Sequence, residues 1–509
     1  MGSGQPESPG AQLVQQRVGH AAHVEISVPI ATSANASASP PVDLMASATL
    51  YRPDPKILEL GEAFYDPVEP AVFPKAIPRF LNRRWADRVG LGDLDDAAWA
   101  RHFCRFDPLP DNLEAPLALR YHGHQFRVYN PDIGDGRGFL FAQLRDDQNR
   151  LLDLATKGSG TTPYSRTADG RLTLKGGVRE VLATEMLEAL GLNTSKTFAL
   201  FETGEQLVRG DEPSPTRSAV LTRLGHGHIR IGTFQRLAFF GEADNIAKLV
   251  RYCLANFYGE QPAQDAAENA LRLFDLVCTA TAKLAARYMA AGFVHGVLNS
   301  DNIAITGESF DYGPWRFTPE WDPDFTAAYF DHHGLYAFGR QPEAIHWDLA
   351  QLAGCLTLVA EAAPLSDLLG GWTERFRPAM TAALVRRLGV TPLGDAEDRA
   401  LAGGLVRALE TRFATIDRLY FDWRGGLDPG AERYPSAPFR ALAAMLERRQ
   451  RAPDHPYWSG PEPCSMHIEE VEAIWAAIAE RDDWSHFETK LAAVRRMGDA
   501  ISAETAPAA

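Results

Sequence analysis

The sequence feature that most constrains the fold is a change in hydrophobic pattern near residue 243. Between about Tyr121 and Leu224, short apolar runs alternate with Gly-rich turns, a pattern typical of β-strands. After residue 243, apolar side chains recur with the helical period of about 3.6 residues, first over 244–258 and then over 266–291. A chain of 509 residues can hold two or three domains, at roughly 100–200 residues each. The sequence therefore predicts a β-rich unit followed by a mostly helical one.

The individual elements follow from the same patterns. A polar stretch rich in Asp and Asn separates two apolar runs, which predicts a hairpin of two strands. Gly191 is expected to close the first helix. The expected strands are 138–144, 151–157, 197–201 and 218–224. The expected helices are 177–190, 244–258, 266–291 and 344–362, with a loop-rich stretch over 293–343 and further helical patterns to about residue 495.

A mixed β/α lobe followed by a helical lobe, with a polar loop just after a long helix, is the layout of a protein kinase. We therefore predict an α+β, protein-kinase-like two-lobed fold with a smaller β-rich N-lobe and a larger helical C-lobe. The predicted division is a disordered leader over 1–48, an N-terminal extension and β-rich nucleotide-binding lobe over 49–243, and a helical C-lobe over 244–509. Met45 is an alternative start of the chain.

Composition narrows the class of protein. The net charge of −15 excludes a global basic field for nucleic acid. The five cysteines are widely spaced and include no C-x-x-C, which argues against a disulfide framework or zinc site and fits a reducing compartment. No apolar run reaches the roughly 18–20 residues of a membrane helix, and no secretory signal pattern is present. We expect a cytoplasmic protein of bacterial type, or a mitochondrial one if eukaryotic, with no nucleic-acid or membrane partner.

The strongest local signal is His295-Gly296-Val297-Leu298-Asn299-Ser300-Asp301-Asn302, followed by Asp311-Tyr312-Gly313. Protein kinases carry H-R-D-x-x-x-x-N and then D-F-G, whose asparagine and aspartate bind magnesium. Asn302 and Asp311 fall on these two positions, and both bring the oxygen ligands that magnesium prefers. The catalytic aspartate of the kinase pattern is replaced by Val297, which cannot accept a proton, so Asp301 is the only carboxylate in the first segment. The alternative is a polar turn between two strands.

Two further pieces stand in the order that a kinase requires. Lys157 ends an expected strand and Glu180 lies on the helix that follows, so the pair could hold a phosphate-binding lysine in place. Gly134 through Gly138 could bring backbone N–H groups close to phosphate. Taken singly, a surface lysine, a solvated glutamate and a hairpin turn explain these residues as well.

A cationic element follows. Arg223 and Arg230 could clamp a polyphosphate with their guanidinium groups, although surface salt bridges are the alternative. His226 and His228 are expected to be structural, because an isolated H-x-H without a third ligand is a weak metal signal.

Taken together, these stretches resemble the selenoprotein O family, a pseudokinase-like branch. The resemblance covers roughly residues 118–355 and is most specific at 162–166 (Thr-Pro-Tyr-Ser-Arg) and 295–302. It implies transfer of AMP from ATP to Ser, Thr or Tyr hydroxyls of protein substrates, with release of pyrophosphate and use of Mg²⁺, or Mn²⁺ in its place. It also implies that ATP binds in a flipped orientation, with its α-phosphorus at the point of attack.

The resemblance also assigns roles to residues. By match, Asp301 would be the general base, Asn302 and Asp311 the metal ligands, and Lys157, held by Glu180, a phosphate ligand. The remaining nucleotide-binding residues would be Gly134, Gly136, Arg137, Asp169, Gly170, Arg223 and Arg230, together with Asp311.

The sequence departs from the family pattern in three places. Lys175-Gly176-Gly177 stands where the family often has Arg-Ser-Ser, Ala327 falls near the activation-segment cysteine of many members, and the C-terminal family motifs are not recognisable. Two other functions stay open at this point, an ordinary kinase that transfers the γ-phosphate and a non-catalytic ATP-binding module.

Overall fold

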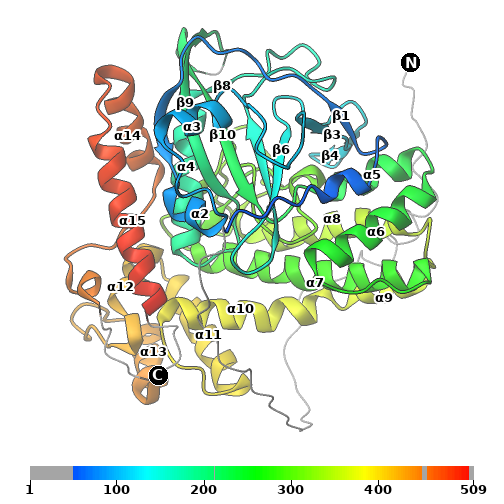
Figure 1. The fold of residues 1–509 in the computed structure, drawn as a ribbon. Coiled ribbons are helices and arrows are strands. Elements are labelled where there is room, and N and C mark those ends of the chain that lie inside the picture. The colour runs from blue at the N-terminus through cyan, green and yellow to red at the C-terminus, as the bar shows by residue number, and fades with distance from the viewer. Residues whose placement is uncertain (1–49, 211, 450–454, 504–509) are drawn as a thin grey trace.

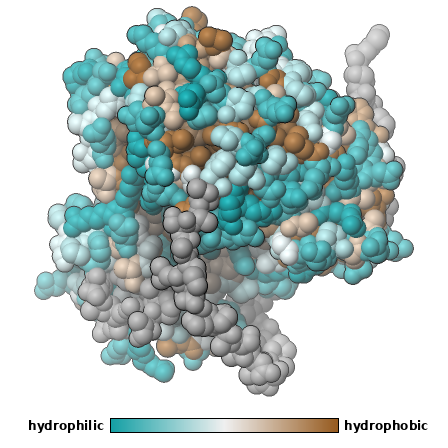
Figure 2. Space-filling model, in the orientation of Figure 1, coloured by the Kyte–Doolittle hydropathy of each residue, from teal (hydrophilic) through white to brown (hydrophobic). Residues whose placement is uncertain are grey.

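The computed structural model describes residues 50–210, 212–449 and 455–503, and these form the two lobes predicted from the sequence. The sheet of the N-terminal lobe lies above a layer of helices that belongs to the C-terminal lobe (Figure 1). On the face of the molecule that Figure 2 shows, hydrophilic side chains cover most of the surface, and hydrophobic ones gather over the N-terminal lobe. The leader predicted over 1–48 lies outside the described residues.

The N-terminal lobe is built on one antiparallel sheet of eight strands. Their order is β1-β3-β6-β7-β10-β9-β2, with β8 paired to β10. The strands are β1 (Tyr65–Pro67), β2 (Ile77–Leu81), β3 (Leu117–Leu119), β6 (Leu140–Arg145), β7 (Leu151–Lys157), β8 (Leu172–Thr173), β9 (Lys196–Leu207) and β10 (Thr216–Gly225). Two small hairpin-like pairs stand apart, β4 (Gly123–Gln125) with β5 (Val128–Asn130), and β11 (Phe293–Val294) with β12 (Arg316–Phe317).

Helices make up most of the remainder. The α-helices are α2 (Arg83–Arg88), α3 (Asp96–Phe103), α4 (Leu174–Ala189), α5 (Ile231–Phe239), α6 (Ala243–Phe257), α7 (Ala266–Ala291), α8 (Gln341–Leu356), α9 (Ala362–Gly370), α10 (Trp372–Leu388), α11 (Asp395–Leu409), α12 (Ile416–Asp422), α13 (Ala437–Leu446), α14 (Ile468–Arg481) and α15 (Ser485–Ala503). Short 3-10 turns are η1 (Lys56–Glu59), η2 (Ser300–Asn302), η3 (Phe338–Arg340), η4 (Arg424–Gly426), η5 (Glu447–Arg449) and η6 (Pro456–Ser459).

Most predicted elements are confirmed, and the errors lie at their ends. The predicted hairpin is the β6–β7 pair, and α6 and α7 match their predicted ranges to within a residue. The strand predicted over 197–201 continues to Leu207, because Glu202 is buried between Arg79 and Arg217 and so extends the strand beyond its apolar run. The helix predicted over 344–362 is wrong at its end: α8 stops at Leu356, and Glu361 is extended at the N-cap position of a new helix, α9.

Helix α4 carries Glu180 and is held from two sides. On one side it lies so close to β9 that a Cβ on Gly177 would be 2.4 Å from a methyl carbon of Leu200. On the other side stand α14 and α15, beside the sheet lobe in Figure 1. Arg495 of α15 forms an ion pair of 2.7 Å with the buried Glu185, and Glu472 of α14 lies 2.8 Å from Lys175. The C-terminal helices therefore fix the helix that positions Glu180.

The five cysteines all lie among the described residues, where each is buried and none forms a disulfide. Within the same described part of the chain, no helix combines the length and the apolar character needed to cross a membrane.

The packing of α4 gives a test of this arrangement. Leu182 is 0% exposed at the centre of the helix. Leu182→Ala is expected to lower the free energy of unfolding by about 2–5 kcal/mol, because the lost side chain leaves a cavity. Leu393→Ala is the matched control, since Leu393 is 40% exposed and its loss should cost less than about 0.5 kcal/mol. Thermal and urea unfolding of both variants measure the difference, and equal losses would contradict this account of α4.

Candidate active site

Lys157 lies between two carboxylates at the junction of the lobes. It is the last residue of β7, and its Nζ is 2.8 Å from Oε2 of Glu180 and 2.8 Å from Oδ1 of Asp311. Lys157 and Glu180 are both buried. The predicted partnership of Lys157 and Glu180 is thus present, and Asp311 joins it from the C-terminal lobe.

Asp311 is a carboxylate surrounded by positive charges. Burial raises its pKa, but the positive charges of Lys157, Arg223 and Arg137 outweigh burial and hold the pKa well below the ordinary value. Its carboxylate is 30% exposed, and its backbone φ of 63° lies in the left-handed region, which is uncommon for a residue with a side chain. A strained, ionised and accessible carboxylate is suited to bind a cation.

Two buried arginines, Arg223 and Arg230, belong to the surroundings of Asp311. Nη1 of Arg223 is 3.4 Å from Oδ1 of Asp311, and its Nε donates to Nε2 of His228 at 3.1 Å. Because Nε2 of His228 accepts this hydrogen bond, its Nδ1 carries the proton and faces Asp153 at 3.3 Å. Burial lowers the pKa of His228, which favours this neutral form. His228 therefore positions Arg223, in keeping with the structural role expected for it.

Arg230 is held in a comparable way. Its Nη1 donates to the backbone carbonyl of Asp301 at 3.1 Å, and its Nη2 lies 3.6 Å from Oδ1 of Asp135. The ring of Phe310 packs against both arginines, with ring-to-guanidinium distances of 5.3 Å for Arg223 and 4.9 Å for Arg230. Sequence patterns alone predict no role for Asp135 or Phe310, although Asp135 lies between Gly134 and Gly136.

Hydrogen bonds fix the segment at 295–302 from three directions. Ser300 Oγ accepts from the backbone N–H of His124 at 2.7 Å and donates to Oε1 of Gln235 at 2.6 Å. His295 Nε2 donates to the carbonyl of Phe310 at 3.0 Å, which ties this segment to the residue before Asp311. Nδ2 of Asn302 donates to the carbonyl of Val297 at 3.0 Å, so its Oδ1 is the atom left for a ligand.

The Gly-rich segment at 134–138 is a connection between β5 and β6, which do not pair with each other, so the hairpin-turn alternative is wrong. Gly134 and Gly136 let this segment pack on the loop at 162–165: a Cβ on Gly134 would be 2.5 Å from the ring of Tyr164. The carbonyl of Arg137 accepts from the N–H of Gly158, 2.6 Å away. Two Gly-rich loops thus lie against each other beside Lys157.

Asp169 and Gly170 lie farther along the second of these loops. Asp169 forms its ion pair with Arg209, at 2.9 Å, rather than with a residue of the Lys157 cluster. Gly170 packs on the backbone of Gly160, where a Cβ would be 2.2 Å from the carbonyl carbon. Their contact with a nucleotide remains a prediction.

Comparison with known proteins decides the family. The family model described as Protein adenylyltransferase SelO matches residues 49–424. The chain belongs to the SelO family.

Proteins named protein nucleotidyltransferase YdiU are similar over nearly their whole length. That of Synechococcus sp. is 47% identical over 486 residues, which cover 88% of this chain and 95% of the relative. That of Synechocystis sp. is 39% identical over 471 residues, which cover 85% and 96%. That of Rhodopseudomonas palustris is 38% identical over 453 residues, which cover 84% and 90%.

Family membership confirms the enzyme class expected from the sequence, a protein adenylyltransferase with a kinase-like fold that uses a nucleotide and a divalent metal. In this SelO family member, Asp311 and Asn302 are the residues predicted to hold the metal, and the chemistry of their side chains suits it. The first is ionised beside Lys157, and the second has its amide nitrogen occupied and its oxygen available. Magnesium sites on enzymes commonly have one or two such protein oxygens, the other ligands being water and substrate phosphate.

Asp301 differs from Asp311 in its surroundings. It is 7% exposed, and its Oδ1 has no hydrogen-bond partner among the described residues. This oxygen lies against Gly123, where a Cβ would be only 2.8 Å away. Burial raises the pKa of Asp301 to about 6, although the nearby Arg230 opposes the shift. The SelO site thus contains one strongly acidic and one weakly acidic carboxyl group.

The pKa of Asp301 predicts a pH-dependent effect on stability. Its pKa is 3.8 in the unfolded chain and about 6 in the folded one, so the folded state binds the proton more tightly. Ionisation therefore destabilises the fold as the pH rises from about 4 through 6, by on the order of 2–3 kcal/mol in total. Asp301→Asn removes this cost, so the metal-free variant should melt at a higher temperature than the wild type at pH 8 and at a similar one near pH 4.

Asp324→Asn is the control for this measurement, because Asp324 is exposed in the same lobe. Its melting temperature should follow that of the wild type at both pH values. A loss of stability in Asp301→Asn that is equal at pH 4 and pH 8 would contradict the assignment of a buried, weakly acidic carboxyl group.

Proposed function

We propose that this chain transfers AMP from ATP to Ser, Thr or Tyr hydroxyls of protein substrates, releases pyrophosphate, and uses Mg²⁺ or Mn²⁺. The observation that carries the proposal is the position of Asp301. Val297 stands at the kinase base position, yet a buried carboxyl group with an unpaired oxygen and a raised pKa lies next to Asn302. These features support Asp301, rather than a residue at position 297, as the proton acceptor.

In the proposed step, the hydroxyl oxygen of the protein substrate forms a bond to the α-phosphorus of ATP. The bond from that phosphorus to the bridging oxygen breaks, and pyrophosphate leaves with the bonding electrons. The hydroxyl proton passes to the carboxylate of Asp301. A carboxylate with a pKa near 6 is a stronger base than an ordinary aspartate and is still ionised at neutral pH.

The cations of the site neutralise phosphate charge in this proposal. Lys157, Arg223 and Arg230 are each held by buried partners, so they need little reorganisation when phosphate oxygens arrive. Arg137 contributes positive charge to the same site, because its charge lowers the pKa of Asp311. A divalent metal, when bound by Asn302 and Asp311, adds further positive charge at the phosphates. Gly134, Gly136, Asp169 and Gly170 complete the proposed nucleotide site.

Five buried thiols without a disulfide fit a reducing compartment, so we also propose that the protein works in the cytoplasm.

Labelled ATP distinguishes this activity from the two alternatives. With ATP labelled at the α-phosphate, wild-type protein and the control Asp324→Ala should label protein, and Asp311→Ala should do so at least about a hundredfold more slowly, because the metal is no longer held. Gel autoradiography measures the transfer. Label from the γ-phosphate alone would instead show a kinase, and label from neither would show a binding module.

Two neighbouring variants separate the base from the metal ligand. Asp301→Asn should lower kcat by about 10²–10⁴-fold while the Kd for ATP changes little, because only proton transfer is lost. Asn302→Ala should instead raise the Mg²⁺ concentration that gives half-maximal rate, since one metal ligand is lost. Steady-state rates across a magnesium titration measure both effects. If the two variants shift the magnesium requirement equally, Asp301 is not acting as the base.

A further inference from the structure

Three cations outside the active site have no acidic partner among the residues that the structure describes. Lys283 and Arg287 lie one turn apart on α7, and Arg386 lies in the last turn of α10. Within the described part of the chain, none of the three side chains forms an ion pair or a side-chain hydrogen bond. The chain as a whole has 66 acidic and 51 basic residues, so carboxylates are not scarce.

Other cations in this region are neutralised. Arg88 pairs with Asp147 at 2.9 Å, Arg150 with Asp146 at 2.7 Å, Arg375 with Asp275 at 2.6 Å, and Arg387 with Asp417 at 2.6 Å. Each of these four arginines has a carboxylate within hydrogen-bond distance. Among the cations that line the two cavities, Lys283, Arg287 and Arg386 share the absence of a described carboxylate partner with Lys196, whose Nζ donates to the carbonyl of Thr194 instead.

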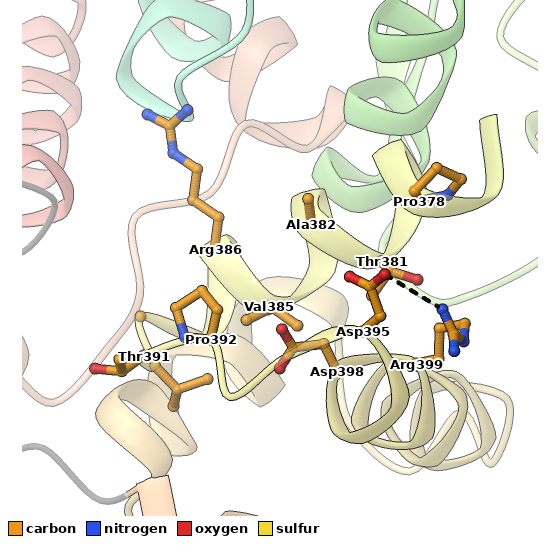
Figure 3. Close-up of a pocket in the computed structure, with 12 residues that line it drawn as sticks. Pro378, Thr381, Ala382, Val385, Arg386, Thr391, Pro392, Asp395, Asp398 and Arg399 are labelled. Carbon is orange, nitrogen blue, oxygen red and sulfur yellow. Dashed lines mark ion pairs between the residues drawn. The ribbon is translucent and has the colours of Figure 1, made fainter. Parts of the chain in front are cut away.

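Arg386 shows this clearly because acidic residues are close to its helix. Figure 3 shows its side chain leaving α10 in the direction opposite to Asp395 and Asp398. Those two carboxylates face Arg399, at 4.0 Å, and Arg449, at 2.5 Å. Arg386 instead extends to the end of α4, where its Nη2 lies 2.9 Å from the position that a Cβ on Gly191 would occupy.

The three cations line two adjoining cavities. One has a volume of about 520 Å³ and extends from Lys283 and Arg287 to Trp85 and Lys196. The other, of about 600 Å³, is lined by Lys283, Arg287 and Arg386 and has an apolar wall of alanines from α10. Each volume lies within the range of about 300–1,000 Å³ that is typical of small-molecule sites.

Each cavity also has one carboxylate in its lining, but Glu188 pairs with Arg84 at 2.6 Å, and Glu374 forms no ion pair with the three cations within the described part of the chain. Positive charges that face one another repel, and an anion between them relieves that repulsion. Burial lowers the pKa of Arg287, and the neighbouring charge of Arg386 lowers it further. The C-terminal ends of α4 and α10 also attract cations. That effect does not explain Lys283, which lies two turns before the end of α7, or the cavities beside it.

We propose that this cleft between α4, α7 and α10 binds a phosphate-bearing small molecule at Lys283, Arg287 and Arg386. Arginine forks and a lysine ammonium match the geometry and charge of phosphate oxygens. The apolar wall of the second cavity would hold the rest of the ligand. This site is separate from the Lys157 cluster, and it does not depend on the proposed function because its test measures binding rather than transfer.

The experiment is hydrogen–deuterium exchange of the full chain, followed by mass spectrometry, with inorganic pyrophosphate and AMP as separate probes. Both probes can also occupy the active site, so the position of protection decides the result. We expect slower exchange in peptides from the second half of α7 and the end of α10. Stronger protection by AMP than by pyrophosphate would show that the apolar wall is used, and equal protection would show that phosphate alone is recognised.

Arg287→Gln and Arg386→Gln should each weaken this protection by about tenfold or more, because a charge-assisted contact is lost. Lys283→Gln is a third variant, on an exposed side chain that the fold does not require. Arg399→Gln is the matched control, since Arg399 lines the neighbouring pocket on the far side of α10 and should bind like the wild type. Protection confined to active-site peptides, or unchanged in all three variants, would overturn the proposal.

Discussion

The interaction on which the rest of the site depends is the contact of Lys157 with Glu180 and Asp311. A buried ammonium group is costly unless it is paired, and here each carboxylate comes from a different part of the fold. Lys157 ends a central strand, Glu180 lies on the helix that crosses the sheet, and Asp311 follows the catalytic loop. The three side chains meet only if both lobes are in place, so this contact contributes a defined geometry more than stability. It also keeps Asp311 ionised, while the more enclosed Asp301 holds its proton up to a pKa of about 6.

The support for this geometry reaches the far end of the chain. The family match ends at residue 424, yet α14 and α15 pack on the helix that carries Glu180. The departure from the family pattern at Lys175-Gly176-Gly177 has a physical reason in the same helix. Gly177 allows α4 to approach Leu200 closely, and Lys175 pairs with Glu472 of α14. The part of the chain beyond the family model therefore bears directly on the position of Glu180.

Sequence patterns predict the features of the fold that depend only on residues close together in the chain. The β6–β7 hairpin, α6, α7 and the order of Lys157, Glu180 and Asp311 were all accessible, because hydrophobic period and motif spacing are local properties. The pairing of Asp135 with Arg230 was not accessible, since it joins residues that only the fold brings together. The same holds for Glu202, whose burial between two arginines extends β9 beyond its apolar run. Helix ends were missed where a single residue changes conformation, as Glu361 does.

We propose that Glu180 acts through Lys157 rather than on the nucleotide itself. A double-mutant cycle with Lys157→Met, Glu180→Gln and the double variant, read out as the Kd for ATP by calorimetry, tests it most directly. If Glu180 only positions Lys157, the double variant should bind ATP no more weakly than Lys157→Met alone, since there is no lysine left to position. Losses that add in the double variant would show that the two residues act independently and would contradict this account of the site.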